Sequence, residues 1–153
     1  MSSFRFGCLA MTPVGSQADW VEQARRAEGR GFATLQVSDH CDRTPLPPLI
    51  ALAAAAQVTS SIRLGTLVLD NDFRHPAVLA KEIAGLDVLS GGRVEIGLGA
   101  GWLDGDYEVS GIHKDRPGVR INRLSQAVRI IKEVLAEAGR QPLTPGTMQF
   151  AAW

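Results

Sequence analysis

The chain has 153 residues, 45% of them hydrophobic, which suffices for one globular domain with an apolar core and is short for two. Its 16 basic and 16 acidic residues balance, so no net field favours nucleic acid or an anionic membrane. No apolar run approaches the roughly 20 residues that span a bilayer, and the amino terminus lacks the apolar core of a signal peptide. Cys8 and Cys41 form neither a metal-ligand spacing nor a disulfide framework. These features predict a cytoplasmic protein without a nucleic-acid or membrane partner and without a metal site.

Strand-like and helix-like segments alternate along the chain. The expected strands are residues 4–11, 33–40, 61–69 and 93–101. The expected helices run over 16–31, from Pro47 to about Val58, from Pro76 to the Ser-Gly-Gly at 90–92, and through a last helix with Ile121, Leu124, Val128, Ile131 and Leu135 on one face. A polar loop precedes that last helix. Such alternation is typical of βαβ units and a parallel sheet over residues 1–140, followed by an irregular tail over 141–153.

The glycines that end the fourth strand do not form a nucleotide-binding fingerprint. A dinucleotide-binding fold carries its Gly-rich turn after the first strand, and the first strand here runs into "MTPVGS". Gly97, Gly99 and Gly101 fail to complete G-x-G-x-x-G in either register, because Trp102 or Asp104 stands where the last glycine belongs. These glycines are expected to let the strand end bend and to leave room above it.

The segment "LQVSDHCDR", residues 35–43, places several proton-binding groups at the end of a strand. An imidazole such as that of His40 exchanges a proton near neutral pH, and a neighbouring carboxylate favours its charged form. Asp39 and His40 are therefore candidates for an active site. The alternative is that Asp39 caps a turn and that His40 packs there. Cys41 and Asp42 are interpreted as loop residues.

Several blocks of the sequence resemble one known family. They are "VSDH", "IRLGTLVL", "RHPAVLAKEIAGLDVLSGGRVEIGLGAGW" and "RINRLSQAVRIIKEVL", and they span about residues 4–138. Together they resemble the luciferase-like monooxygenase superfamily, and most of all its branch that uses the deazaflavin coenzyme F-420. That family folds as a (β/α)₈ barrel, which typically needs about 250 residues. The resemblance therefore implies an α/β fold of parallel barrel type with four βα units, roughly half of a barrel.

The resemblance also implies roles for particular residues. It places Asp39 against the deazaflavin ring as a cofactor-binding residue and makes His40 an active-site polar group with a catalytic role. It further implies a bulge in the third strand with a non-proline cis peptide, Leu67 to Val68, that supports the ring. Without the resemblance, Leu67 and Val68 are ordinary strand residues. The implied cofactor is coenzyme F-420, with FMN as the alternative.

Strand alternation predicts a polar inner face independently of the family. Arg63 and Glu95 each stand two residues before a glycine on adjacent strands, so they are expected to lie on one face at the same height as an ion pair of structural role. The same face is expected to hold Thr34, Gln36 and Ser38. The opposite face is expected to pack against helices through Ile62, Leu64, Val94, Ile96 and Leu98.

Some positions depart from the family's sugar-phosphate dehydrogenases. Those enzymes carry an acidic proton donor where this chain has Trp102, and an active-site Trp where it has Thr44. A sugar-phosphate substrate is therefore disfavoured. Asp104, Asp106 and Tyr107 could supply substitute polar groups from the following loop, or they are solvated loop residues.

Two functional classes remain open. The first is an oxidoreductase that transfers hydride or activates oxygen at a flavin or deazaflavin, acting on a small organic molecule. The second is a non-catalytic shortened relative that binds a flavin or self-associates. In full-length relatives the cofactor phosphates are held mainly by later strands, and a half-barrel leaves strand edges uncovered. The chain is therefore expected to form a homo-oligomer, the alternative being that it is a piece of a longer reading frame.

Overall fold

A computed structural model describes residues 4–10, 14–41, 46–137 and 148–150. Twelve elements follow in order: β1 (Gly7–Leu9), α1 (Gln17–Gly29), β2 (Thr34–Val37), α2 (Pro48–Ala56), β3 (Arg63–Thr66), β4 (Leu69–Asp70), the 3₁₀ turn η1 (Asn71–Phe73), α3 (Pro76–Ser90), β5 (Val94–Gly99), α4 (Asp104–Ser110), α5 (Pro117–Glu137) and β6 (Met148–Phe150). None of the described helices is long and apolar enough to cross a membrane.

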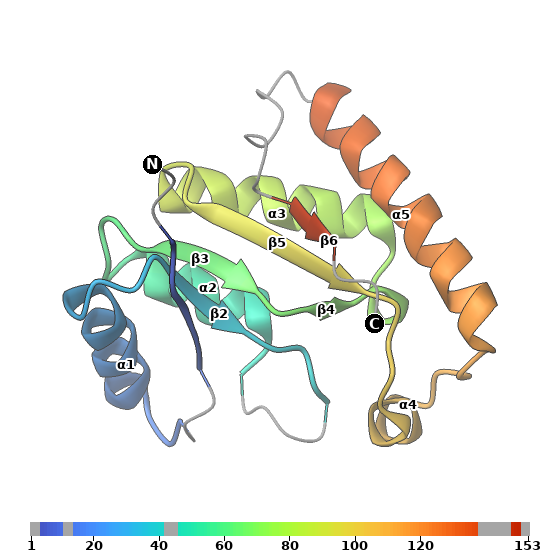
Figure 1. Cartoon of the computed structure of the whole chain (residues 1–153), viewed down its shortest axis with the longest axis horizontal. Helices are drawn as coiled ribbons and strands as arrows, with labels where there is room; N and C mark the ends of the chain where they lie inside the picture. Colours follow the sequence, from blue (N-terminus) through green and yellow to red (C-terminus); the bar gives the residue numbers. More distant parts are fainter. Residues whose placement is uncertain (1–3, 11–13, 42–45, 138–147, 151–153) are drawn as a thin grey trace.

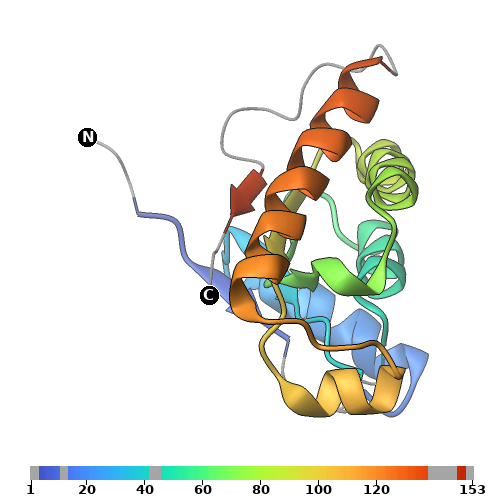
Figure 2. The same ribbon diagram turned by 90° about the vertical axis from the view of Figure 1, so that its right-hand side faces the viewer.

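Every described strand pair is parallel, as the alternation of elements predicts. β1, β2 and β3 are neighbours in the sheet, and β3 and β4 follow each other along one edge of β5. β6 pairs with the other edge of β5 (Figure 1). Helices α1, α2, α3 and α5 form a row in which each contacts the next. This row covers one face of the sheet (Figure 2). The architecture is a parallel α/β sheet whose strands all end at the same edge.

Four segments differ from the sequence-based expectation. β1 covers only Gly7–Leu9 of the strand expected over 4–11, and residues 11–13 lie outside the described part. The strand expected over 61–69 is interrupted after Thr66 and resumes at Leu69. The polar loop contains a short helix, α4, because acidic groups stand in its first turn and Gly111, in the left-handed conformation, caps its end after Ser110. The tail expected to be irregular contains β6, and the rest of 141–153 lies outside the described residues.

The two faces of the sheet separate apolar from polar residues as alternation predicts. Ile62, Leu64, Val94, Ile96 and Leu98 are all buried in the core. On the other face Arg63 Nε lies 2.5 Å from Glu95 Oε1, which confirms the predicted pair. The expectation of equal height is wrong, because the ladder aligns Glu95 with Gly65. The long arginine side chain spans the offset of two residues, and Thr34 Oγ1 donates to Glu95 Oε2 at 3.1 Å.

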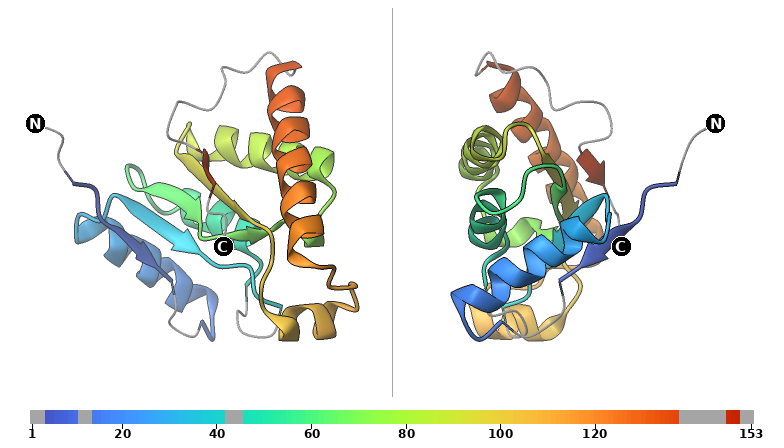
Figure 3. Two further views of the ribbon diagram at one scale, coloured as in Figure 1. Left: turned by 45° about the vertical axis from the view of Figure 1, so that its right-hand side comes forward. Right: turned by 90° about the vertical axis from the view of Figure 1, so that its left-hand side faces the viewer.

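Polar contacts brace the amino-terminal end of the sheet. The Arg93 guanidinium donates to the carbonyls of Ala56, Thr59 and Ile62 at 2.9 to 3.1 Å, which ties the end of α2 to β3. Glu28 accepts backbone N–H groups from the turn before β3, including that of Ile62 at 3.0 Å. Partial burial alone would raise the pKa of Glu28, but the N–H donors of this turn lower it to about 2. These contacts brace the strands at their amino-terminal ends, so the carboxyl ends remain available for a site. Figure 3 shows that β2, β4 and β5 point toward the same end of the molecule.

Candidate functional site

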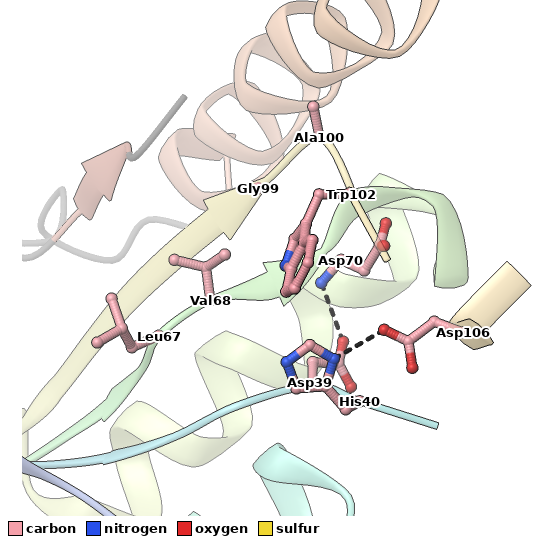
Figure 4. A pocket seen from close by; sticks show the side chains of 10 residues that line it. Asp39, His40, Leu67, Val68, Asp70, Gly99, Ala100, Trp102 and Asp106 are labelled. Carbon is pink, nitrogen blue, oxygen red and sulfur yellow. Dashed lines mark hydrogen bonds and ion pairs between the residues drawn. The ribbon is translucent and has the colours of Figure 1, made fainter. Parts of the chain in front are cut away.

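A pocket of about 390 Å³ lies at the carboxyl ends of β2, β4 and β5. Its lining comprises Asp39, His40, Leu67, Val68, Asp70, Gly99, Ala100, Gly101, Trp102 and Asp106 (Figure 4). The pocket therefore brings together all four residues that the sequence singled out. In parallel β/α folds this end of the sheet is where active sites are built.

The pocket wall at the strand interruption is formed by Leu67 and Val68. The peptide bond between them is cis, as the resemblance implied. Leu67 remains 42% exposed although it is a large apolar residue. A Cβ atom on Gly99 would come within 2.6 Å of Val68 Cγ2, so any other residue here would displace the Val68 side chain. The wall thus consists of two aliphatic side chains, and Val68 packs against Gly99 of β5, which has no side chain.

Asp39 ties the end of β2 to the segment after β4. Its carboxylate accepts from Arg74 Nη1 at 2.5 Å and Nη2 at 3.1 Å, and from the Asp70 N–H at 3.1 Å. Bidentate pairing of this kind is strong and directional. The carboxylate therefore connects two segments of the protein, and Asp39 also lines the pocket.

His40 forms a close pair with a buried carboxylate. Its Nδ1 atom lies 2.7 Å from Asp106 Oδ2, and the Cys41 N–H donates to Asp106 Oδ1 at 2.8 Å. The Asp106 side chain is only 4% exposed. The imidazole also meets the ring of Trp102 edge-on, with centroids 6.2 Å apart. The arrangement can hold an imidazole in one orientation beside the pocket.

Asp70 is a second buried carboxyl group in the pocket wall. Burial raises its pKa to about 6, and the nearby charges of Asp72, Asp39 and Asp106 act in the same direction, against a hydrogen bond from the Asp72 N–H. Burial also raises the pKa of the Tyr107 hydroxyl, which donates to Asp72 Oδ2 at 3.0 Å. Asp70 therefore keeps its proton to a higher pH than an exposed aspartate does.

Sequence reasoning singled out only part of this site. Of the three loop residues considered as substitute polar groups, Asp106 lines the pocket, Tyr107 is buried and bonded to Asp72, and Asp104 pairs with Lys114 at 2.6 Å on the surface. Asp70 was missed, although an acidic residue directly after the strand expected over 61–69 is the same signal that pointed to Asp39. Among the described residues no group of three His, Cys, Asp or Glu side chains could hold a metal ion.

The fold and the pocket define a parallel β/α sheet with a site at its carboxyl edge and a cis peptide in the site wall. The model of the luciferase-like monooxygenase family matches residues 1–150, and the chain belongs to this family. Its structural neighbours are luciferase-like barrels of which it covers about 40%, so the chain forms a partial barrel.

The similar proteins include both deazaflavin and monooxygenase enzymes. An F-420-dependent glucose-6-phosphate dehydrogenase from Amycolatopsis mediterranei is 36% identical over 123 residues, which cover 76% of this chain and 37% of the relative. A 4-hydroxyprotoasukamycin monooxygenase from Streptomyces nodosus is 32% identical, over 87% of this chain and 34% of that protein. The chain thus spans less than half the length of these relatives.

A solved structure with a bound deazaflavin has the same fold. An F-420-dependent secondary alcohol dehydrogenase in complex with an F-420–acetone adduct has a TM-score of 0.70 and 28% sequence identity. The match covers 83% of this chain and 40% of the dehydrogenase. These relatives support a flavin or deazaflavin as the class of cofactor without choosing between them.

Proposed function

We propose that the chain supplies the ring-binding and proton-transferring part of an oxidoreductase that uses coenzyme F-420, with FMN as the alternative cofactor. The observation that carries the proposal is the pocket itself. One aliphatic wall, Leu67 and Val68, lies across from a histidine held by a buried carboxylate. One pocket thus combines an apolar wall with a side chain that can exchange a proton.

The lining of the pocket fits a flat aromatic ring. Its volume of about 390 Å³ lies at the lower end of the roughly 300–1,000 Å³ usual for ligand pockets. Leu67, Val68 and Trp102 offer apolar surface, and Trp102 is 61% exposed. The described lining contains no Lys or Arg that could bind a phosphate. The residues present suit the ring of the cofactor, whose contacts would be with Leu67, Val68, Trp102 and the Asp39–His40 turn.

The chain's own chemical contribution is proton handling. A bound flavin or deazaflavin supplies the hydride or oxygen chemistry. His40 exchanges a proton with a substrate hydroxyl, and the Asp106 carboxylate, 2.7 Å from its Nδ1 atom, stabilises the imidazolium that forms. The substrate class we propose is a small alcohol or a comparable organic molecule. A sugar phosphate is disfavoured, because Trp102 stands where the resembling dehydrogenases carry an acidic proton donor.

A fluorescence titration with coenzyme F-420 and with FMN tests the proposal. The wild-type chain should bind one of them with micromolar Kd. Leu67→Glu should weaken that binding at least tenfold, because a carboxylate would replace the apolar wall. Ile121→Glu is the matched control, since Ile121 is similarly exposed at 45% but lies on α5. Failure of the wild type to bind either cofactor would overturn the proposal.

The second candidate is a non-catalytic member of the family that binds a flavin without turnover. The observation favouring it is that the chain covers only 34 to 37% of the curated relatives described above. The two candidates are distinguished by adding a panel of small alcohols and measuring, from the cofactor's absorbance, whether any of them reduces the bound cofactor. Binding without reduction by any donor would favour the second.

A further inference from the structure

We infer that Thr66 is a positioning residue for the pocket wall formed by Leu67 and Val68. Its hydroxyl group binds β5 where the strand that contains β3 and β4 is interrupted, and this contact fixes the place at which the wall begins. The hydrogen bonds are those of the chain alone. The expected effect on cofactor binding rests on the proposed function.

The two halves of the interrupted strand differ in register by one residue. Gly65 of β3 is aligned with Glu95, and Leu69 of β4 is aligned with Leu98. Four residue steps therefore lead from Gly65 to Leu69, and only three lead from Glu95 to Leu98. One extra residue in a strand is a bulge, and a bulge disrupts the backbone ladder around it.

The hydroxyl of Thr66 bonds the stretch of β5 that faces this bulge. The Gly97 N–H donates to Thr66 Oγ1 at 3.0 Å, and the hydroxyl donates to the Gly97 carbonyl at 2.9 Å. A hydroxyl can fill both roles at once, because it is donor and acceptor together. Thr66 is 3% exposed and Gly97 is buried, so the backbone groups of Gly97 need a partner within the protein.

The backbone on either side of Thr66 is held by β2. Val37 is aligned with Thr66, and the Leu67 N–H donates to the Val37 carbonyl at 3.0 Å. The chain is thus fixed to β2 through its backbone and to β5 through the hydroxyl, directly before the wall. Leu67 is 42% exposed, whereas Leu64 and Leu69 on the flanking strands are fully buried. The chain therefore leaves the core immediately after Thr66 and forms the pocket wall (Figure 4).

Two substitutions separate the hydroxyl from the rest of the side chain. Thr66→Val keeps the branched shape but removes the donor and the acceptor, whereas Thr66→Ser keeps the hydroxyl. In NMR spectra of the cofactor-free protein, Thr66→Val should speed hydrogen exchange of the Gly97 amide about tenfold or more, because this N–H loses its partner. It should also shift the methyl signals of Leu67 and Val68. Thr66→Ser should leave both measurements close to those of the wild type.

Thr34→Val is the matched control in the same sheet. Thr34 is also buried, and its hydroxyl donates to Glu95 Oε2 at 3.1 Å, but it stands at the first position of β2 and does not line the pocket. In the fluorescence titration, Thr66→Val should weaken cofactor binding about tenfold, because the wall no longer has a fixed position. Thr34→Val and Thr66→Ser should leave the Kd within about threefold of the wild type.

The wild-type spectrum keeps the test valid if Thr66→Val does not fold. A Gly97 amide that exchanges as fast as an unbonded amide in the wild type would overturn the inference. The inference would also be overturned if a folded Thr66→Val variant kept the wild-type methyl signals of Leu67 and Val68 or the wild-type affinity, or if Thr66→Ser behaved like Thr66→Val. Shifted methyl signals in a protein that binds neither cofactor would support the positioning role and contradict the proposed function.

Discussion

Three aspartates at the carboxyl edge of the sheet differ in what holds them. Asp39 is paired with Arg74, and Asp106 with His40 and the Cys41 amide. Asp70 accepts one backbone hydrogen bond and lies among the other carboxylates, so burial raises its pKa to about 6. Burial therefore sets Asp70 apart, because it makes loss of the proton from this carboxyl group more costly than in water.

Replacement of Asp70 by asparagine should stabilise the protein above pH 6. A folded-state pKa of about 6, above the ordinary value of 3.8, means that this group's contribution is complete below pH 4 and is lost as the pH rises through 6. Asparagine keeps the acceptor for the Asp72 N–H and never ionises. In urea unfolding, Asp70→Asn should exceed the wild type by up to about 3 kcal/mol at pH 8 and match it near pH 4. Equal stability of the two proteins at pH 8 would contradict the raised pKa.

The junction between β5 and α4 shows how glycines make room for a site. Gly101 has a φ angle of 75°, and a Cβ atom there would come within 2.5 Å of an Asp70 carboxylate oxygen and would also meet the Tyr107 hydroxyl. The residue thus combines a backbone conformation that disfavours other side chains with close packing against two buried polar groups.

These two demands on Gly101 can be separated with a matched glycine. Gly111 has a nearly equal φ of 71°, but nothing lies within 4 Å of its added Cβ. Gly111→Ala should therefore lose only the conformational cost, about 1–2 kcal/mol of the free energy of unfolding. Gly101→Ala should lose about 1–3 kcal/mol more from overpacking, measured by urea denaturation. Equal losses in the two variants would mean that the crowding at Asp70 and Tyr107 is relieved at no cost.

At the scale of the molecule, strand β1 forms an edge of the described sheet at which another chain could pair. Among the described strands β1 pairs only with β2. The chain entering it carries Phe4 and Phe6, which are 91% and 72% exposed. Exposed strand edges with apolar side chains are prone to pair with further strands. Self-association through this edge stays a prediction.

Sedimentation at micromolar concentration tests the expected self-association. Phe6→Lys should shift the protein toward monomer, because a charge would lie at the edge that pairs. Val88→Lys is the matched control, since Val88 is 62% exposed on α3. A shift caused only by Val88→Lys would place the contact on the helices instead. A wild-type protein that sediments as a monomer would contradict self-association by either surface.

Most of the fold and four of the ten residues that line the pocket were predicted from the sequence and the family resemblance. Alternating hydrophobic periods predicted the parallel sheet, and alternation within strands predicted the pair between Arg63 and Glu95. Asp39 and His40 could be found because a strand end is visible as the point where a buried apolar run meets polar residues. Leu67 and Val68 were identified only through the family resemblance, since nothing in their own chemistry distinguishes them from core residues.

The remaining features depended on tertiary contacts. α4 is too short to have a hydrophobic period, so the sequence left Asp106 in a loop, and only the packed structure places it 2.7 Å from His40, 66 positions earlier. The partners of Asp39 and the raised pKa of Asp70 likewise arise from residues distant in the chain and from burial. Local patterns determine which segments become strands and helices, because their periods are a property of neighbouring residues. Which carboxylate meets which histidine or arginine is decided only when those segments pack.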